Sequence, residues 1–309
     1  MSINVTPAMQ VAYRNNVEMV LQQQKSPILD CITVQDDTSA EKVKIKDLVG
    51  NTTPQEINER HGDTKYNNPT FDAVWLAKPN PLTYADIIDT ADRLGTSIDL
   101  QGASVMSGAG TIVRAYTQRV LEGFYGNIVS GKDGTITTPF PGGQIIPVTA
   151  GGASGNQKFN VAKIRAATKL LAQSYVDLSL PRYMVLTADD NDALLQEIPV
   201  TSADFKGSYR GQVDDTGRVM SLLGWTFIYE ELDNPYLNTV PALATDASGF
   251  RKTPFWVKQG VIANFWERKF ASVDLLPGKN LSAQVYARTT LAATRTQPGM
   301  SGIILNLKG

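Results

Sequence analysis

The chain has few of the residues from which catalytic and metal sites are usually built. Its 309 residues include one cysteine, Cys31, and one histidine, His61. A single cysteine excludes an intramolecular disulfide and a cysteine-based zinc site. A Ser-His-Asp triad or a histidine zinc site would have to use His61, which lies in the polar, turn-rich segment NERHGDT. We interpret His61 as a surface residue and Cys31 as an inert thiol, because Cys31 has no electropositive sequence neighbours.

Excess charge and long apolar runs are also missing. The 29 basic and 30 acidic residues give a formal net charge of -1, so we expect no bulk attraction to nucleic acid or anionic lipid. No stretch approaches about 18 uninterrupted apolar residues, and the N-terminus lacks the basic region and apolar run of a signal peptide. We therefore expect a protein that neither spans a membrane nor is exported by that route, with any DNA contact local or incidental. The lone cysteine is consistent with a reducing compartment.

Recognisable cofactor motifs are absent as well. The glycine-rich stretches 142–143 and 151–155 lack the GxxxxGK[ST] pattern of a phosphate-binding loop, and Lys132 is followed by Asp133 instead of Ser or Thr. The acidic cluster at 189–192 lacks the glycine and the terminal glutamate of a calcium loop. We interpret this cluster as capping residues at a helix N-terminus. The sequence therefore predicts no catalytic, cofactor or metal residues.

The most prominent feature that is present is the stretch 104–126, which predicts one long helix. At about 1.5 Å per residue it would be roughly 35 Å long, enough to cross a small domain. Gly126 and Asn127 favour a stop, because both tolerate the left-handed backbone conformation. Gly108 and Gly110 oppose the helix by about 1 kcal/mol each. Its apolar residues repeat at helical spacing: Val105, Ala109, Ile112, Val113, Tyr116, Val120 and Phe124.

Two unusual segments precede this helix. Thr6 and Pro7 resemble a helix start, and Met9, Tyr13 and Val17 then repeat on one face, which predicts an amphipathic N-terminal arm. Residues 30–79 alternate in strand fashion in places but hold few large apolar groups. A segment of this length without its own core is expected to lie against another surface.

The rest of the chain mixes helices and strands, which predicts an α+β fold with a small α/β lobe. The expected elements are a helix at 83–95 with a Thr83/Asp86 capping box, short strands within 130–157, a helix capped by Asn160, a strand at 183–187, a helix at 190–198, two apolar runs around Gly224, and two long strands at 271–275 and 285–293 joined by a turn. We expect the two long strands to cover the long helix.

These features favour a subunit of an assembly, because an arm, an extended segment and a long helix become stable when neighbouring chains supply the missing surface. The alternative from another class is an α/β enzyme with its site near Asp189 and Asp190, at the carboxyl end of the 183–187 strand. That alternative lacks a nucleophile, a base and an orienting group at recognisable spacing.

The order of parts resembles the major capsid protein of tailed bacteriophages, the Hong Kong 97 type fold. The resemblance covers nearly the whole chain, and the order and spacing of its motifs carry it more than any single one. The similar stretches are YRNNVEMVLQQQ at 13–24, DAVWLAKP at 72–79, YADIIDTADRL at 84–94, NVAKIRAATKLL at 160–171, GRVMSLLGWTFIYEE at 217–231 and VYARTTLAATRT at 285–296.

The resemblance implies a domain plan. Residues 1–29 would be the N-arm and 30–79 the extended β-hairpin called the E-loop. Residues 80–130, completed by 268–309, would form the P-domain with its long spine helix. Residues 131–267 would form the α/β A-domain.

The resemblance also implies a structural function without enzymatic activity or cofactor. Copies would assemble as pentamers and hexamers into an icosahedral head, in the host bacterial cytoplasm, around double-stranded DNA held by weak non-specific contact. The arm begins within a few residues of Met1, so a scaffold would be a separate protein or would already have been removed. We expect a separate scaffolding protein as partner, together with a portal and a decoration protein, and no membrane. Maturation by covalent cross-linking would need a matched Lys and Asn on neighbouring subunits, and the sequence assigns no such pair. The candidate inter-subunit contacts are Met9, Tyr13, Val17, Lys42, Lys44 and Lys46.

A second role is compatible with the same fold: an encapsulin-like compartment that encloses a cargo enzyme. Whether particles contain DNA or an enzyme separates the two.

Overall fold

The computed structural model describes residues 26–38, 40–56, 58, 60, 62–89, 100–152, 155–197 and 212–308. The fold is α+β, as predicted, and its strands form three sheets. No helix within these ranges is long and apolar enough to cross a membrane. The strands are β1 (Thr33–Gln35), β2 (Lys42–Val49), β3 (Phe71–Ala77), β4 (Leu82–Ile88), β5 (Ile128–Ser130), β6 (Ile136–Thr138), β7 (Ile145–Ile146), β8 (Arg182–Leu186), β9 (Gln212–Val213), β10 (Val219–Leu222), β11 (Trp225–Tyr229), β12 (Arg251–Val257), β13 (Val261–Leu276), β14 (Ser282–Arg295) and β15 (Ser301–Asn306). The helices are α2 (Leu100–Tyr125), α3 (Val161–Gln173), α4 (Ala188–Leu195) and α7 (Val240–Leu243).

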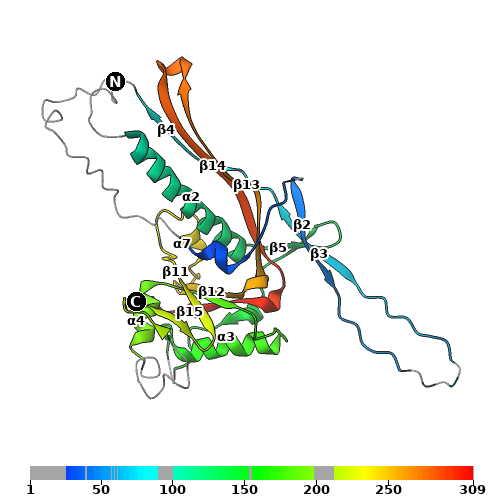
Figure 1. Ribbon diagram of the computed structural model, residues 1–309. Helices are drawn as coiled ribbons and strands as arrows, with labels where there is room; N and C mark the ends of the chain where they lie inside the picture. The colour runs from blue at the N-terminus through cyan, green and yellow to red at the C-terminus, as the bar shows by residue number, and fades with distance from the viewer. Residues whose placement is uncertain are drawn as a thin grey trace.

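A seven-stranded sheet forms the centre of the lower lobe in Figure 1, in the order β7-β15-β12-β8-β11-β10-β9. Helix α3 packs on it with Ile164 and Leu171 fully buried. The predicted cap of this helix is confirmed, because the Asn160 side chain accepts a hydrogen bond from the backbone N–H of Lys163 at 2.9 Å. The predicted turn at Gly224 is also confirmed, and there β10 reverses into β11.

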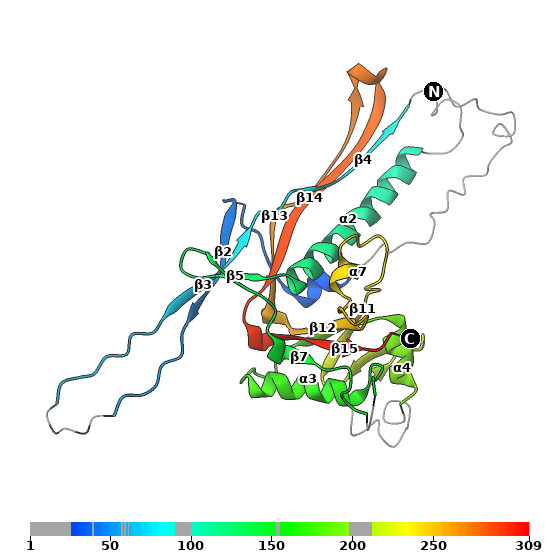
Figure 2. The ribbon, with the colours of Figure 1, turned by 180° about the vertical axis from the view of Figure 1, so that it is seen from behind.

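A second sheet, in the order β1-β13-β14-β4, forms the upper part of the molecule. Strands β13 and β14 are the two predicted long strands, and they pair antiparallel from Val261↔Arg295 out to Leu276↔Ser282. Helix α2 lies along this sheet, as Figures 1 and 2 show from opposite sides. The helix and β14 approach each other closely at Gly123, where an added Cβ would lie 2.0 Å from the Ala293 carbonyl oxygen.

Helix α2 confirms the predicted long helix and ends at Tyr125, but without the left-handed backbone that was expected there. Neither Gly126 nor Asn127 adopts a positive φ. Instead the Arg295 side chain, buried under the Phe140 ring, donates a hydrogen bond to the Gly126 carbonyl oxygen at 2.6 Å. A cation at this position satisfies a terminal carbonyl and complements the helix dipole.

The predicted helix at 83–95 is wrong over the part that the structure describes, because these residues form the strand β4. Its residues Leu82 to Ile88 pair antiparallel with Thr289 to Ala283 of β14. Alternate side chains of β4 turn toward α2, so that the Tyr84 ring covers Gly108 and Asp86 accepts a hydrogen bond from Ser104. This short apolar pattern fits the period of a helix as well as that of a strand, and pairing with the long strand β14 favours the strand. Residues 90–95 lie outside the described ranges.

The third sheet, in the order β2-β3-β5-β6, holds the segment expected to lack a core of its own. The 130–157 region, expected as a connection with short strands, supplies β6 and the end of β5 to this sheet and β7 to the seven-stranded sheet. It therefore links two lobes and at the same time supports the β2–β3 hairpin.

Candidate assembly surfaces

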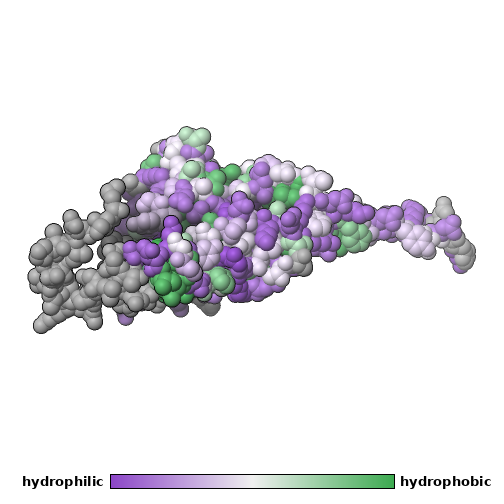
Figure 3. Space-filling model, turned by 90° about the horizontal axis from the view of Figure 1, so that it is seen from above, coloured by the Kyte–Doolittle hydropathy of each residue, from purple (hydrophilic) through white to green (hydrophobic). Residues whose placement is uncertain are grey.

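The β2–β3 hairpin and the irregular strand pair beyond it project from the body as a long arm (Figures 1 and 2). The base of the arm is anchored by buried Val43, Ile45 and Leu76, which pack against Ile262 and Trp266. Further out, Val49 and Phe71 form a cross-strand pair, and their exposed fractions are 63% and 73%. Seen from above in Figure 3, the arm is narrow and largely hydrophilic. An exposed apolar pair on such an arm is suited to contact another surface.

Three side chains hold the arm to the turn between β5 and β6. The indole N–H of Trp75 donates to the Gly131 carbonyl at 2.8 Å, and the Asp72 carboxylate accepts from the Gly131 N–H at 2.6 Å. Lys42 Nζ donates to the Gly134 carbonyl at 2.8 Å. Both glycines have positive φ, +98° and +62°, a conformation that side-chain-bearing residues rarely adopt. The turn therefore fixes the direction in which the arm leaves the body.

The three lysines predicted to contact another subunit all lie on β2, but their surroundings within the chain differ. Lys42 binds the β5–β6 turn and also lies 5.5 Å from the centre of the Trp75 ring. Lys44 forms an ion pair with Asp47. Lys46 lines an open groove of about 590 Å³ between β2 and the loops around Ser174 and Pro298. The other predicted contacts, Met9, Tyr13 and Val17, lie outside the described residues.

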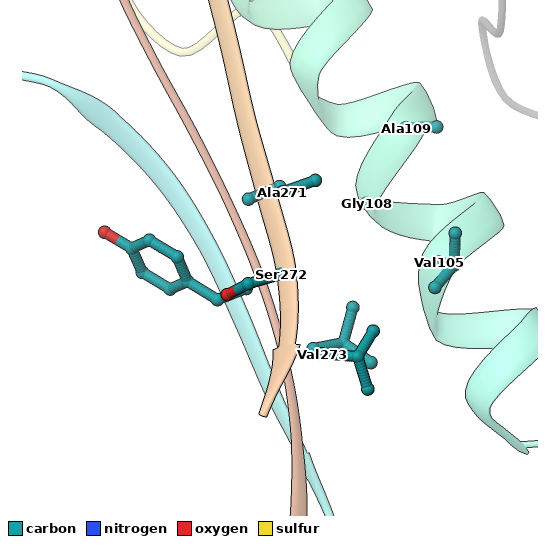
Figure 4. Close-up of a pocket in the computed structure, with 9 residues that line it drawn as sticks. Val105, Gly108, Ala109, Ala271, Ser272 and Val273 are labelled. Carbon is teal, nitrogen blue, oxygen red and sulfur yellow. The ribbon is translucent and has the colours of Figure 1, made fainter. Parts of the chain in front are cut away.

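A second surface lies between the first half of α2 and the β13–β14 hairpin. There a mainly apolar groove of about 160 Å³ is open to solvent. Figure 4 shows Val273 pointing toward α2 and Ser272 pointing away from it, as strand alternation requires. Val105 and Val273 border the groove with exposed fractions of 47% and 53%. The full lining is Val105, Gly108, Ala109, Ala271, Ser272, Val273, Val285, Tyr286 and Ala287.

The acidic cluster that carried the enzyme alternative is a helix cap. Thr187 and Asp190 form a capping box at the start of α4, as the sequence predicted for these acidic residues. Arg251 forms ion pairs with both carboxylates, with its guanidinium nitrogens 2.7 Å from Asp189 and 3.3 Å from Asp190. Burial raises the pKa of Asp190, and the charge of Arg251 opposes that shift. These carboxylates are therefore occupied by structural partners.

Among the remaining groups singled out from the sequence, the structure describes Cys31. Cys31 is buried, and burial raises the pKa of its thiol to about 11, so the nucleophilic thiolate is scarce at neutral pH. His61 lies outside the described residues. Within the described ranges, no three His, Cys, Asp or Glu side chains gather in a way that could hold a metal ion.

Sequence reasoning missed the features that define these surfaces. Val49 and Phe71 flank the turn-rich stretch between β2 and β3, so a hairpin interpretation of 30–79 could have paired them. Nothing local signals the bond from Trp75 to Gly131, because the partners are 56 residues apart in sequence.

Comparison with known proteins shows which family the chain belongs to. A family model described as "Phage capsid protein" matches residues 5–308. The chain belongs to this phage capsid protein family. No curated protein matches the chain.

Solved capsid structures share the fold of this phage capsid protein at low sequence identity. The capsid of cyanophage P-SCSP1u has a TM-score of 0.72 and 13% identity, covering 98% of this chain and 94% of that chain. The capsid of cyanophage Pam1 has a TM-score of 0.66 and 12% identity, covering 98% of each chain. The head of Helicobacter pylori bacteriophage KHP40 has a TM-score of 0.66 and 9% identity, covering 99% of this chain and 98% of that chain.

The resemblance to tailed-phage capsid proteins of the Hong Kong 97 type is thereby confirmed, and the encapsulin alternative is not favoured. The protein is a structural component of a virion capsid, built by self-association, and its family is not a class of enzymes.

Proposed function

We propose that this protein is the major capsid protein of a tailed bacteriophage, forming pentamers and hexamers that close into an icosahedral head around double-stranded DNA. The observation that carries the proposal is the capsid family match over residues 5–308. The projecting arm and the groove that the described residues leave open support it, because both become stable surfaces when copies meet.

The proposed domain boundaries follow the three sheets. Residues 1–29 act as the N-arm, 30–79 as the E-loop, 80–130 with most of 268–309 as the P-domain, and 131–267 as the A-domain. Strand β15 is assigned to the A-domain sheet, because it pairs with β12 from Trp256↔Ser301 to Arg251↔Asn306. Helix α2 is the spine of the P-domain.

Inter-subunit contact is proposed for the N-arm and for the lysine-bearing strand of the E-loop. Met9, Tyr13 and Val17 would place an apolar face on an adjacent subunit. Among Lys42, Lys44 and Lys46, we place Lys46 closest to this role, because Lys42 and Lys44 already bind Gly134 and Asp47 within the chain. We expect Tyr13→Asp and Val17→Asp to leave subunits soluble and to block shell closure, as counted by electron microscopy. Normal particles from both variants would contradict a role of the N-arm in shell closure.

Further partners are proposed from the same role: a separate scaffolding protein, a portal and a decoration protein, with assembly in the host cytoplasm. The net charge of -1 gives the shell only weak, non-specific attraction for packaged DNA. A steep fall of DNA affinity with salt, measured on isolated subunits, would contradict this weak attraction.

The content of purified particles tests the proposed role directly. Particles from infected cells should contain double-stranded DNA that resists nuclease until the shells are opened. Particles filled with a single host enzyme and no DNA would support the compartment role instead.

A further inference from the structure

The guanidinium group of Arg182 is a buried positive charge without a counter-charge among the described residues. The side chain is 9% exposed, and its Nε and Nη1 atoms have no hydrogen-bond partner in that part of the chain. Nη2 donates to the Leu223 carbonyl oxygen at 3.4 Å. Burial lowers the pKa of Arg182, and no carboxylate of the described ranges opposes that shift. Because burying an unpaired cation is costly, this position favours an anionic ligand.

Strand alternation turns Arg182 toward the face of the seven-stranded sheet that α3 covers. Arg182 lies two residues before Met184 on β8, and Met184 belongs to the buried cluster beneath α3. On the neighbouring strand Trp225 is the partner of Arg182, and the guanidinium carbon lies 5.3 Å from the centre of the Trp225 ring. The indole N–H of Trp225 donates to the Thr168 hydroxyl of α3 at 2.9 Å. The Trp225 side chain therefore connects Arg182 with this helix.

An open depression of about 370 Å³ lies between α3 and the turn from β10 to β11. From α3 its lining includes Arg165, Thr168 and Lys169, which share one side of the helix. Arg165 and Lys169 are exposed, and neither forms an ion pair with the residues that the structure describes. Arg182 lies against the wall of the depression, because Leu223 both lines it and accepts the Arg182 hydrogen bond. Three cations are therefore grouped around one opening.

We propose that this depression is a phosphate-binding site, where Arg165 and Lys169 attract the anion and Arg182 pairs with it. The Nε and Nη1 atoms of Arg182 carry N–H donors without partners in the described chain, and a phosphate group offers several acceptor oxygens. A phosphate group can also carry more than the single negative charge of a carboxylate, which suits three cations. The site goes beyond the capsid role and does not depend on it, because one chain supplies every residue named.

Calorimetric titration of the purified protein with inorganic tripolyphosphate tests this site. We expect saturable binding of one tripolyphosphate per chain at low salt. Arg182→Met and the double variant Arg165→Gln/Lys169→Gln should each weaken the affinity at least tenfold. The control Lys78→Gln/Lys279→Gln also removes two positive charges at exposed positions, and it should change the affinity less than twofold.

Urea unfolding of Arg182→Met separates binding from folding. Because Arg182 has no anionic partner among the described residues, an apolar side chain of similar length should leave the unfolding midpoint unchanged or move it upward. Arg182→Lys keeps the charge but loses the planar set of donors, so it should weaken tripolyphosphate binding less than Arg182→Met does. If Arg182→Met does not fold, the exposed pair Arg165→Gln/Lys169→Gln decides alone.

Competition with double-stranded DNA identifies the source of the phosphate. Displacement of tripolyphosphate by DNA would assign the site to the DNA backbone, and binding without displacement would assign it to a free polyphosphate; both results support a phosphate site. Because three cations take part, the logarithm of a DNA affinity at this site should fall with that of salt concentration with a slope no steeper than about −3.

Three results would overturn the phosphate site and leave the capsid role intact. The first is the absence of saturable tripolyphosphate binding, and the second is an equal loss of affinity in Lys78→Gln/Lys279→Gln. The third is a hexaglutamate peptide that binds more tightly than tripolyphosphate and loses affinity in Arg165→Gln/Lys169→Gln, which would assign the depression to an acidic protein segment. Failure of the unmodified protein to form shells would count against the capsid role and would leave the binding result unchanged.

Discussion

The close approach between α2 and β14 at Gly123 provides a prediction with a large expected effect. In Gly123→Ala the new Cβ would lie 2.0 Å from the Ala293 carbonyl oxygen and 2.5 Å from its carbon. Ordinary contacts are about 3.5–4.0 Å, so the helix and the strand would have to separate by more than about 1 Å. The atoms in the way belong to the backbone of a paired strand, and no side chain can rotate to make room.

The magnitude follows from two opposing effects. Replacing glycine by alanine inside a helix favours the helix by about 1 kcal/mol. Overpacking a core costs about 1–3 kcal/mol and sometimes more, and here it disturbs the buried cluster around Leu121 and Phe124. Because this clash is with backbone at a very short distance, we expect Gly123→Ala to lower the free energy of unfolding by about 2 kcal/mol or more.

Gly108→Ala is the matched control on the same helix. Its Cβ would meet the Tyr84 ring at 2.9 Å, and that ring is half-buried and can shift by a few tenths of an ångström. The higher helix propensity of alanine then offsets most of the cost of moving the Tyr84 ring. The free energy of unfolding should therefore stay within about 1 kcal/mol of the parent value. Urea unfolding of unassembled subunits, followed by tryptophan fluorescence, measures both variants. Equal stability of Gly123→Ala and the parent, or equal losses in both variants, would refute the close-approach reasoning.

Three further predictions concern the arm, the acidic cluster and a buried lysine. Trp75→Phe removes the indole bond to the β5–β6 turn, worth about 1 kcal/mol, so limited proteolysis within the arm should be roughly fivefold faster. Arg251→Met leaves Asp190 buried without its cation and should destabilise the subunit by about 3–5 kcal/mol, whereas Arg268→Met, at an exposed ion pair, should change urea unfolding little. Burial lowers the pKa of Lys163 from 10.5 to about 8, so between these pH values the unfolded state binds more protons than the folded state. The free energy of unfolding should therefore rise from about pH 8 to about pH 10, and Lys163→Met should flatten that rise.

Local signals predicted the elements that depend on local chemistry. Asn160 caps α3 because its side chain reaches the third backbone N–H of its own helix, and the β13–β14 turn uses Pro277 and Asn280, which suit turn geometry. The long α2 was predictable despite Gly108, and the structure shows that this glycine leaves room for the Tyr84 ring.

Elements that depend on distant partners were not predictable. The Thr83/Asp86 pattern resembles a helix start, yet β14, about 200 residues later, provides a paired strand that overrides it. Val105 and Val273, which line the same groove, are far apart in the sequence. Trp75 and Gly131, which are linked by a hydrogen bond, are also far apart, so neither contact leaves a local sequence pattern. The resemblance supplied the capsid role, and the contact surfaces required the folded chain.

Sedimentation and electron microscopy of the purified protein, expressed with and without a scaffolding protein, test the central claim most directly. The account predicts closed shells, or free pentamers and hexamers that close when scaffold is added. A homogeneous monomer that stays monomeric in both conditions would contradict it.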